Sequence, residues 1–327
     1  MMTFASSTST IRLRITALLF ASALCAPAIA QEVESHGSDL ISAGLDDRSI
    51  GRHIEAEGGA LIESREFKST VELLEASGSI ATLTLQHPRT EPIAPADLYE
   101  HASRGVLVVR HIFKCDHCPR WHTLSGGTAF VISAEGVCVT NRHMFEQKHD
   151  DHRTYVMVMT SDGAVFGVEQ VLANDAPADI AIFKLSKGRF ESREIDFSET
   201  RAIALSLAHS SRVGESVSLI AHPENSCYTL TTGVISRRAV THRGINSDVD
   251  TEELVPAIEV TCEYGVGSSG GPVMDRRMNV VGMVCNTSTV YSGKGRDKEP
   301  QMVRRRCIPS ERVLSLIAQG KPQDNRK

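Results

Sequence analysis

The sequence predicts an all-β protein, a barrel or a sandwich, with one short helix before the strands and another at the C-terminus. Three observations support this prediction. From residue 96 onward, short β-type runs recur along the chain. Turn residues, glycine among them, separate these runs, and the runs fall into two successive series. Segments with a helical period are few and short.

The first series of predicted strands follows a short predicted helix at 96–103. Its strands lie at 105–113, 127–133, 136–141, 155–160, 164–173 and 180–185. The second series lies at 202–208, 216–222, 229–236, 257–264, 271–275, 280–286 and 302–308. A helix is expected at 309–319, with Ser310 as its N-cap and Gly320 just past its end. Residues 321–327 form a tail.

Residues 1–30 have the composition of a cleaved secretory signal. Arg12 and Arg14 precede an apolar run that ends in Ala28-Ile29-Ala30. The run contains Pro27 and is shorter than the roughly 20 residues that a membrane-spanning helix requires. We therefore expect cleavage near Ala30, export to the periplasm or the extracellular medium, and no stable membrane anchor.

Residues 31–95 are polar and weakly periodic, and we expect a partly disordered N-terminal extension there. Only 68–76 reads as a helix and only 80–85 as a strand. The proline-containing segment 87–95 reads as a linker to the main domain at 96–320.

Composition gives only broad bounds on function. The chain has 327 residues, of which 41% are hydrophobic and 23% are charged, which is ordinary for a globular protein. That length allows one large domain or two modest ones. The formal net charge of −5 provides no basic field that would attract nucleic acid, so nucleic acid is not an expected partner.

The segment 263–275, EYGVGSSGGPVMD, concentrates glycine and serine in one turn between two predicted strands. A serine hydroxyl is a weak nucleophile that needs a neighbouring base and backbone N–H groups directed at the oxyanion it creates. Glycine permits the inward curl that would direct the N–H groups of Gly267 and Ser269 to one point. We therefore expect Ser269 to be the nucleophile and Ser268 to belong to the turn.

The base and its orienting carboxylate are expected at the ends of strands in the first series. His143 directly follows the β run at 136–141 and precedes a short polar stretch. Asp179 leads into the apolar strand at 180–185. Asp175 is the competing carboxylate, but its surroundings, NDAP, are typical of an exposed turn. The sequence favours Asp179.

His143 in VTNRH, Asp179 in ADIAIFKL and Ser269 in GSSGGP together resemble the three signatures of trypsin-like, chymotrypsin-fold serine proteases, in that family's chain order. The segments at 97–109, 220–236 and 307–317 are similar to the bacterial HtrA-like branch. The resemblance covers about 96–320. It implies two six-stranded antiparallel β-barrels, at about 104–195 and 202–308, with the active site between them. It also implies a serine-type endopeptidase that forms an acyl-enzyme and needs no cofactor.

Two departures from the family bear on regulation. We expect no PDZ domain after the catalytic domain, and hence no regulation through one. Ser268 stands where digestive members of the family carry an aspartate that pairs with a freed N-terminus, so activation by an inserted N-terminus is not expected. The alternative function is a catalytically silent double barrel that binds peptides or unfolded chains in the cell envelope.

Specificity is indicated by few residues. Glu263, six residues before Ser269, stands where trypsin-like enzymes place the floor of the primary pocket, and a carboxylate there would favour Arg or Lys. The alternative is that Glu263 faces solvent. The strand segment 284–288, with Cys285 and Asn286, is expected to bind substrate as an added β-strand and to read mainly its backbone.

The cysteines leave several possibilities open. Cys25 departs with the signal, and an odd number, seven, remains. Cys115, Cys118 and His122 have a spacing that zinc accepts, but a fourth ligand is not evident, and export favours a disulfide between the two cysteines or the pairing of each with a different partner. Pro119 occupies the position that haem attachment requires for histidine. We therefore expect no bound metal.

Overall fold

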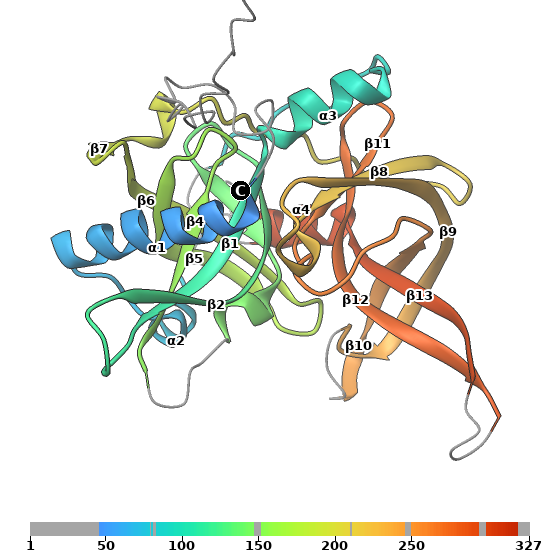
Figure 1. Cartoon of the computed structure of the whole chain (residues 1–327). Helices are drawn as coiled ribbons and strands as arrows, with labels where there is room; N and C mark the ends of the chain where they lie inside the picture. The colour runs from blue at the N-terminus through green and yellow to red at the C-terminus, as the bar shows by residue number, and fades with distance from the viewer. Residues whose placement is uncertain are drawn as a thin grey trace, which may run out of the picture. The chain divides into compact units, whose positions relative to one another are not determined.

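The computed structural model describes residues 46–78, 80, 83–146, 152–209, 211–245, 250–293 and 299–319. The expected signal sequence, Cys25 and the expected tail lie outside these residues. Within them the chain is mostly β-structure with a few helices (Figure 1). None of the helices in these ranges has both the length and the apolar character that crossing a membrane requires.

The strands of the first series close into a ring. Their hydrogen-bonding order is β3 (Val137–Thr140), β2 (Trp121–Val131), β1 (Val106–Lys114), β4 (Thr154–Met159), β5 (Val165–Asp175) and β6 (Ile180–Phe190). A pairing of β3 with β6 closes the ring, and β7 (Arg193–Ile195) forms a hairpin with β6. Neighbouring strands are antiparallel throughout.

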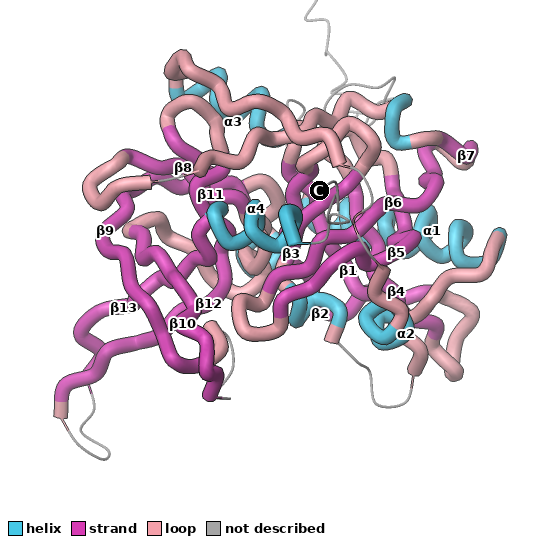
Figure 2. The backbone as a smooth tube through the Cα atoms, turned by 180° about the vertical axis from the view of Figure 1, so that it is seen from behind, coloured by secondary structure: helices cyan, strands magenta, loops and turns pink. Residues whose placement is uncertain are grey.

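The strands of the second series form a closed six-stranded antiparallel barrel. Its elements are β8 (Ser216–Ala221), β9 (Thr229–Arg243), β10 (Asp250–Val260), β11 (Pro272–Asp275), β12 (Val280–Ser292) and β13 (Glu299–Pro309). They follow the order β10-β13-β12-β11-β8-β9. Figures 1 and 2 both show β12 and β13 running on together beyond the rest of this barrel. The expected pair of six-stranded antiparallel barrels, the chymotrypsin-like fold, is confirmed.

Each barrel has its own apolar interior because alternate residues of a strand face opposite sides. In β1, Leu107 and Val109 join a cluster drawn from every strand of the first ring, which identifies that cluster as the interior of the first barrel. Val106 and Val108 point the other way, into a larger cluster that includes residues of the helices. A third cluster, which includes Leu219 and Ile258, fills the second barrel.

Helix α1 (Asp47–Ser64) corrects the expectation that no helix precedes residue 68. Asp46 caps it by accepting the N–H of Arg48 at 3.2 Å. Ile50, Ile54 and Leu61 lie on one buried face. The helix contacts β1, β2, β4, β5 and β6, across which it runs in Figure 1.

Glycines in α1 mark close contact with the sheet. A Cβ at Gly59 would lie 2.2 Å from Cδ1 of Trp121, and one at Gly58 would lie 3.0 Å from Cγ of Met157. A Cβ at Gly51 would meet nothing within 4 Å. Two of these three glycines therefore permit the approach of the helix to β2 and β4, although glycine ordinarily counts against a helix.

The other helices largely agree with the expectations. They are α2 (Thr70–Glu75), capped by Ser69 in a capping box, α3 (Pro95–Ser103) and α4 (Ser310–Gln319). Ser310 was expected to be the N-cap of α4, and this expectation is wrong. Ser310 is the first residue of the helix, and its hydroxyl donates to the carbonyl of Ala208 at 2.7 Å.

Two expected strands do not form. The described residues of 80–85 are irregular, and 202–208 contributes only an isolated bridge between Leu207 and Val280. Single backbone hydrogen bonds hold the second segment, such as that from the N–H of Leu205 to the carbonyl of Val131 at 2.8 Å.

The segment before α3 is bonded to the second barrel. Asn279 accepts the N–H of Arg89 at 2.7 Å and donates to the carbonyl of Arg89 at 3.0 Å. Ile93 donates its N–H to the carbonyl of Arg276 at 2.9 Å. At the start of α1, Asp47 accepts the N–H of Cys227 at 2.9 Å. The residues before 96 thus contact both barrels.

Candidate active site

His143 and Asp179 form a directly bonded pair at the rim of the first barrel. The 3-10 turn η1 (Arg142–Phe145) follows β3 and carries His143. Its Nδ1 lies 2.7 Å from Oδ2 of Asp179, and its backbone N–H donates to Oδ1 at 2.9 Å. Both carboxylate oxygens therefore bind the same residue, which fixes the imidazole in one orientation.

The backbone of Asp179 is also held in place. Its φ is +56°, in the left-handed region that aspartate tolerates better than most residues. Its carbonyl accepts the side-chain amide of Asn141 at 3.0 Å and the N–H of Arg142 at 3.1 Å. The side chain of Asp179 is 6% exposed, so the carboxylate is largely shielded from water.

Asp175, the competing carboxylate, has other partners. It accepts the N–H of Ala178 at 3.0 Å and pairs with Nε of Arg312 at 2.6 Å. Arg312 belongs to α4, so Asp175 ties the C-terminal helix to the first barrel. The expectation that Asp175 lies in an exposed turn is wrong, because the residue is buried; its ion-pair partner is Arg312.

Ser269 lies in a turn that two glycines make possible. Gly267 has φ +91°, and a Cβ there would lie 2.4 Å from the carbonyl oxygen of His222. Gly270 has φ +84°, and a Cβ there would lie 2.0 Å from the carbonyl oxygen of Thr128. No other residue fits these two positions without displacing backbone. Ser268, by contrast, is fully buried within the turn.

Thr128 of β2 holds this turn at two points. Its hydroxyl donates to the carbonyl of Gly267 at 3.0 Å, and its N–H donates to the carbonyl of Ser269 at 2.8 Å. Its own carbonyl accepts the hydroxyl of Thr140 at 2.7 Å. A strand of the first barrel thus positions the turn of the second.

Two chains of contact bring Ser269 into the neighbourhood of the His143–Asp179 pair. Gly270 donates its N–H to the carbonyl of Val284 at 3.1 Å, and the next residue, Cys285, directs its thiol to Oδ2 of Asp179 at 3.5 Å. A Cβ at Gly127 would lie 3.3 Å from the carbonyl oxygen of Ser269 and 2.7 Å from Cε of Met144, the neighbour of His143.

The backbone N–H groups of Gly267 and Ser269 are available for a ligand. Among the described residues, neither donates a hydrogen bond to another protein group. The carbonyls of the same two residues are bound by Thr128. An oxyanion site requires a turn whose N–H groups are not already hydrogen-bonded within the protein, and this turn meets that requirement.

Glu263, Cys285 and Asn286, the residues expected to set specificity, differ from one another in exposure and in bonding partners. The side chain of Glu263 is 75% exposed and forms an ion pair with Arg305. Cys285 is buried, and burial followed by the charge of Asp179 raises the pKa of its thiol. The thiol therefore stays protonated and donates to Asp179, so only its backbone can face a substrate. The side-chain amide of Asn286 binds the carbonyl of Ile245.

One edge of β12 is partly occupied at residue 284, because the N–H of Val284 donates to the carbonyl of Gly271 at 2.9 Å and its carbonyl accepts the N–H of Gly270 at 3.1 Å. From residue 284 onward β12 pairs with β13 on one side, while β11 pairs with it only through residues 280–283. In the described part of the chain no further strand pairs along the other edge. An extended peptide could add there.

His222 is a site residue that the sequence did not single out. It is fully buried, its N–H donates to the hydroxyl of Thr128 at 3.3 Å, and its Nδ1 accepts the N–H of Tyr228 at 2.9 Å. Burial and then the charge of Arg110 lower its pKa to about 3. This neutral histidine supports Thr128 and, through its carbonyl, packs against Gly267.

The β1–β2 hairpin holds the cysteines that the sequence expected to form a disulfide. Cys115 and Cys118 are separate thiols, and so are the other described cysteines. Hydrogen bonds from His122 and from the backbone of Arg120 lower the pKa of Cys118 to about 7. The sequence expectation of a disulfide is wrong for this structure.

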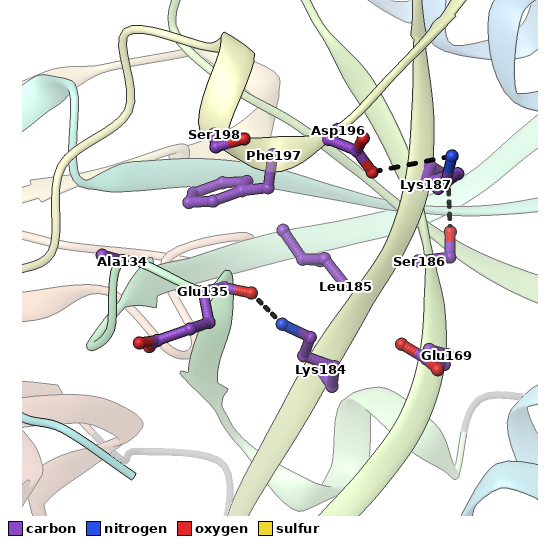
Figure 3. Close-up of a pocket in the computed structure, with 10 residues that line it drawn as sticks. All are labelled: Ala134, Glu135, Glu169, Lys184, Leu185, Ser186, Lys187, Asp196, Phe197 and Ser198. Carbon is purple, nitrogen blue, oxygen red and sulfur yellow. Dashed lines mark hydrogen bonds and ion pairs between the residues drawn. The ribbon is translucent and has the colours of Figure 1, made fainter.

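A pocket on the first barrel is separate from these groups. Figure 3 shows it between β6, the turn at Ala134–Glu135 and the 3-10 turn η2 (Phe197–Glu199). Lys184 donates to the carbonyl of Glu135, and Lys187 lies 3.9 Å from Asp196. None of its lining residues is a candidate catalytic residue, and its lysines are already bound.

Comparison with known proteins finds similarity to serine peptidases. Residues 127–283 match the family described as the trypsin-like peptidase domain. The chain is 27% identical over 229 residues to Serine protease HTRA1 of Xenopus tropicalis, covering 69% of this chain and 42% of that protein. It is 28% identical over 176 residues to a probable periplasmic serine endoprotease, DegP-like, of Bartonella henselae, covering 54% of this chain and 30% of that protein.

Among solved structures, one of an HtrA-type protease with a tripeptide has 22% identity and a TM-score of 0.48, covering 69% of this chain and 63% of that one. The chain spans less than half the length of the two curated relatives described above. The chain is similar to the trypsin-like serine peptidases. Among these peptidases it is similar to proteins of the HtrA-like branch.

Proposed function

We propose that this protein is a serine endopeptidase that hydrolyses peptide bonds through an acyl-enzyme. The observation that carries the proposal is the 2.7 Å contact between His143 Nδ1 and Asp179 Oδ2, beside a clamped turn that contains Ser269. A carboxylate that holds one ring nitrogen leaves the other nitrogen to act as a base. The proposed triad is His143, Asp179 and Ser269, with the N–H groups of Gly267 and Ser269 as the oxyanion site.

The reaction proceeds in two halves. Ser269 Oγ attacks the carbonyl carbon of the scissile peptide while Nε2 of His143 accepts the hydroxyl proton. Asp179 stabilises the resulting imidazolium, and the two N–H groups bind the oxygen anion. The C–N bond breaks, and His143 protonates the leaving amine. Water then attacks the ester with His143 as base, which releases the acid and restores Ser269.

The proposed substrate is an extended polypeptide bound along the open edge of β12. Backbone hydrogen bonds to the residues of β12 that follow Val284 would align it, which favours cleavage of flexible or unfolded segments. The ion pair of Glu263 with Arg305 argues against a preference for Arg or Lys based on that carboxylate. Pocket shape around the turn would then set the preference.

We further propose that the protein acts outside the cytoplasm. The composition of residues 1–30 supports cleavage near Ala30 and export. The DegP-like relative, described as a probable periplasmic endoprotease, is consistent with such a location.

The decisive experiment is labelling with a fluorophosphonate, which reacts only with an activated serine, followed by peptide mapping. We expect the label on Ser269 and complete loss in Ser269→Ala, together with a fall in peptide cleavage on the order of 10⁶. Ser268→Ala is the matched neighbour and should still be labelled at Ser269. A folded wild-type protein without label and without cleavage would reject the proposal in favour of the silent peptide-binding alternative.

A further inference from the structure

The tip of the β1–β2 hairpin brings together three side chains that bind borderline and soft metals. Cys115, Cys118 and His122 each place one ligand atom within 4.8 Å of the other two. Among the residues that the structure describes, this is the group of His, Cys, Asp and Glu side chains that lies close enough to hold a metal ion. None of the three belongs to the proposed catalytic residues.

The geometry points to a zinc site at this hairpin tip, formed by Cys115 Sγ, Cys118 Sγ and His122 Nε2. Tetrahedral zinc, with Zn–S bonds of about 2.3 Å and Zn–N bonds of about 2.0 Å, separates its ligand atoms by roughly 3.5–3.8 Å. Cys118 Sγ and His122 Nε2 are 3.0 Å apart, and the widest separation in the group does not exceed 4.8 Å. Adjustments of about an ångström would therefore complete the site.

The hairpin register explains how the ligands meet. Phe113 pairs with His122 and Lys114 pairs with Trp121, so Cys115 follows the end of β1 beside the start of β2. The short loop returns Cys118 between them, and the N–H of His117 donates to Cys115 Sγ at 3.3 Å.

The base of the hairpin is held in place by α1. Glu63 accepts Nζ of Lys114 at 2.6 Å and Nε1 of Trp121 at 3.1 Å. The ring of Phe113 lies 5.7 Å from that of His122. Because the residues beside the ligands are already anchored, binding would order only the short loop between them.

The donor set selects the metal. Two thiolates and one imidazole suit zinc and exclude magnesium or calcium, which require oxygen ligands. Asp116, between the two cysteines, lies 3.5 Å from Nδ1 of His152, so its carboxylate is directed to that residue. The three protein ligands then leave the fourth position to water.

The test uses the full chain without a histidine tag, purified with zinc present and without chelator. Zinc per chain is measured by mass spectrometry of the metal, and thiol state by alkylation and intact mass. We expect about one zinc per chain in the wild type, and its loss in Cys115→Ser, Cys118→Ser and His122→Asn. His117→Asn, an exposed histidine in the same loop, is the matched control and should keep the metal.

Cobalt substitution gives a second, spectroscopic readout. Wild-type protein loaded with Co²⁺ should show thiolate-to-cobalt charge transfer and tetrahedral d–d bands, and Cys118→Ser should lose the charge transfer while its circular dichroism stays unchanged. Two results would overturn the proposal. One is reduced protein that binds neither metal, and the other is zinc that persists in all three ligand variants.

Discussion

The hydroxyl of Thr128 in the first barrel lies 3.0 Å from the carbonyl oxygen of Gly267 in the second, and donates to it. The same residue binds the carbonyl of Ser269 through its N–H. The geometry of the proposed oxyanion site therefore depends on a side chain that takes no part in the chemistry. Thr128 is a positioning residue.

We predict that Thr128→Val lowers kcat by about tenfold to 100-fold with a smaller change in KM, because a displaced turn misdirects the N–H groups. Thr128→Ser keeps the hydroxyl and should restore most of kcat. Steady-state kinetics on a peptide substrate measure both. Wild-type kcat in Thr128→Val would contradict the positioning role.

His222 should make stability depend on pH. Its pKa is lowered from 6.5 to about 3 in the folded protein, so below pH 6.5 the unfolded chain binds a proton that the folded chain does not. The contribution of neutral His222 to the free energy of unfolding is fully present above pH 6.5 and decreases as the pH falls toward 3. Between pH 7 and pH 5 the expected loss is about 2 kcal/mol.

Urea denaturation at these two pH values measures that loss. His222→Gln has no charge to gain and should show a smaller difference between pH 7 and pH 5, whatever its absolute stability. His117→Gln removes an exposed histidine and should leave the difference as in the wild type. The prediction would be wrong if the change in the free energy of unfolding between pH 7 and pH 5 were the same in all three proteins.

The Arg312–Asp175 pair should stabilise the attachment of α4. The two side chains are 17% and 7% exposed, so removal of one charge leaves the other largely buried. We expect Arg312→Met to lower the free energy of unfolding by about 2–3 kcal/mol. Addition of Asp175→Asn to that variant should recover part of the loss, which a double-mutant cycle quantifies. Independent, additive losses would argue against the pair.

The glycines of α1 should respond in opposite directions to alanine. Gly51→Ala meets open space and should raise the free energy of unfolding by about 0.5–1 kcal/mol. Gly59→Ala would place its Cβ 2.2 Å from Trp121, and should lower it by about 1–3 kcal/mol. Chemical denaturation compares the two. Stabilisation by both substitutions would mean that α1 does not pack on β2.

Much of the barrel architecture could be predicted from sequence because strand periodicity is local. The strands β1 and β6 begin within one residue of the starts of the predicted runs at 105–113 and 180–185. The turn around the candidate residue Ser269 could be predicted for a related reason, since Gly267 and Gly270 have backbone conformations that favour glycine.

The rest depends on contacts between residues distant in sequence. Glycine ordinarily disfavours a helix, so Gly58 and Gly59 do not indicate α1 in the sequence. The partners that explain these glycines, Met157 and Trp121, lie in the sheet. Thr128 and His222 carried no signal because their roles appear only when the two barrels meet. A lone threonine in a strand looks the same whether or not it holds a turn.

The residues before 96 also bear on how the protein should be expressed. Asp47 accepts a hydrogen bond from the backbone N–H of Cys227, and Asn279 forms two hydrogen bonds with the backbone of Arg89. Ile54 of α1 is fully buried. A recombinant fragment that starts at the first barrel would expose an apolar surface and lose these ties, and would be expected to aggregate. Expression boundaries should therefore begin upstream of Asp46.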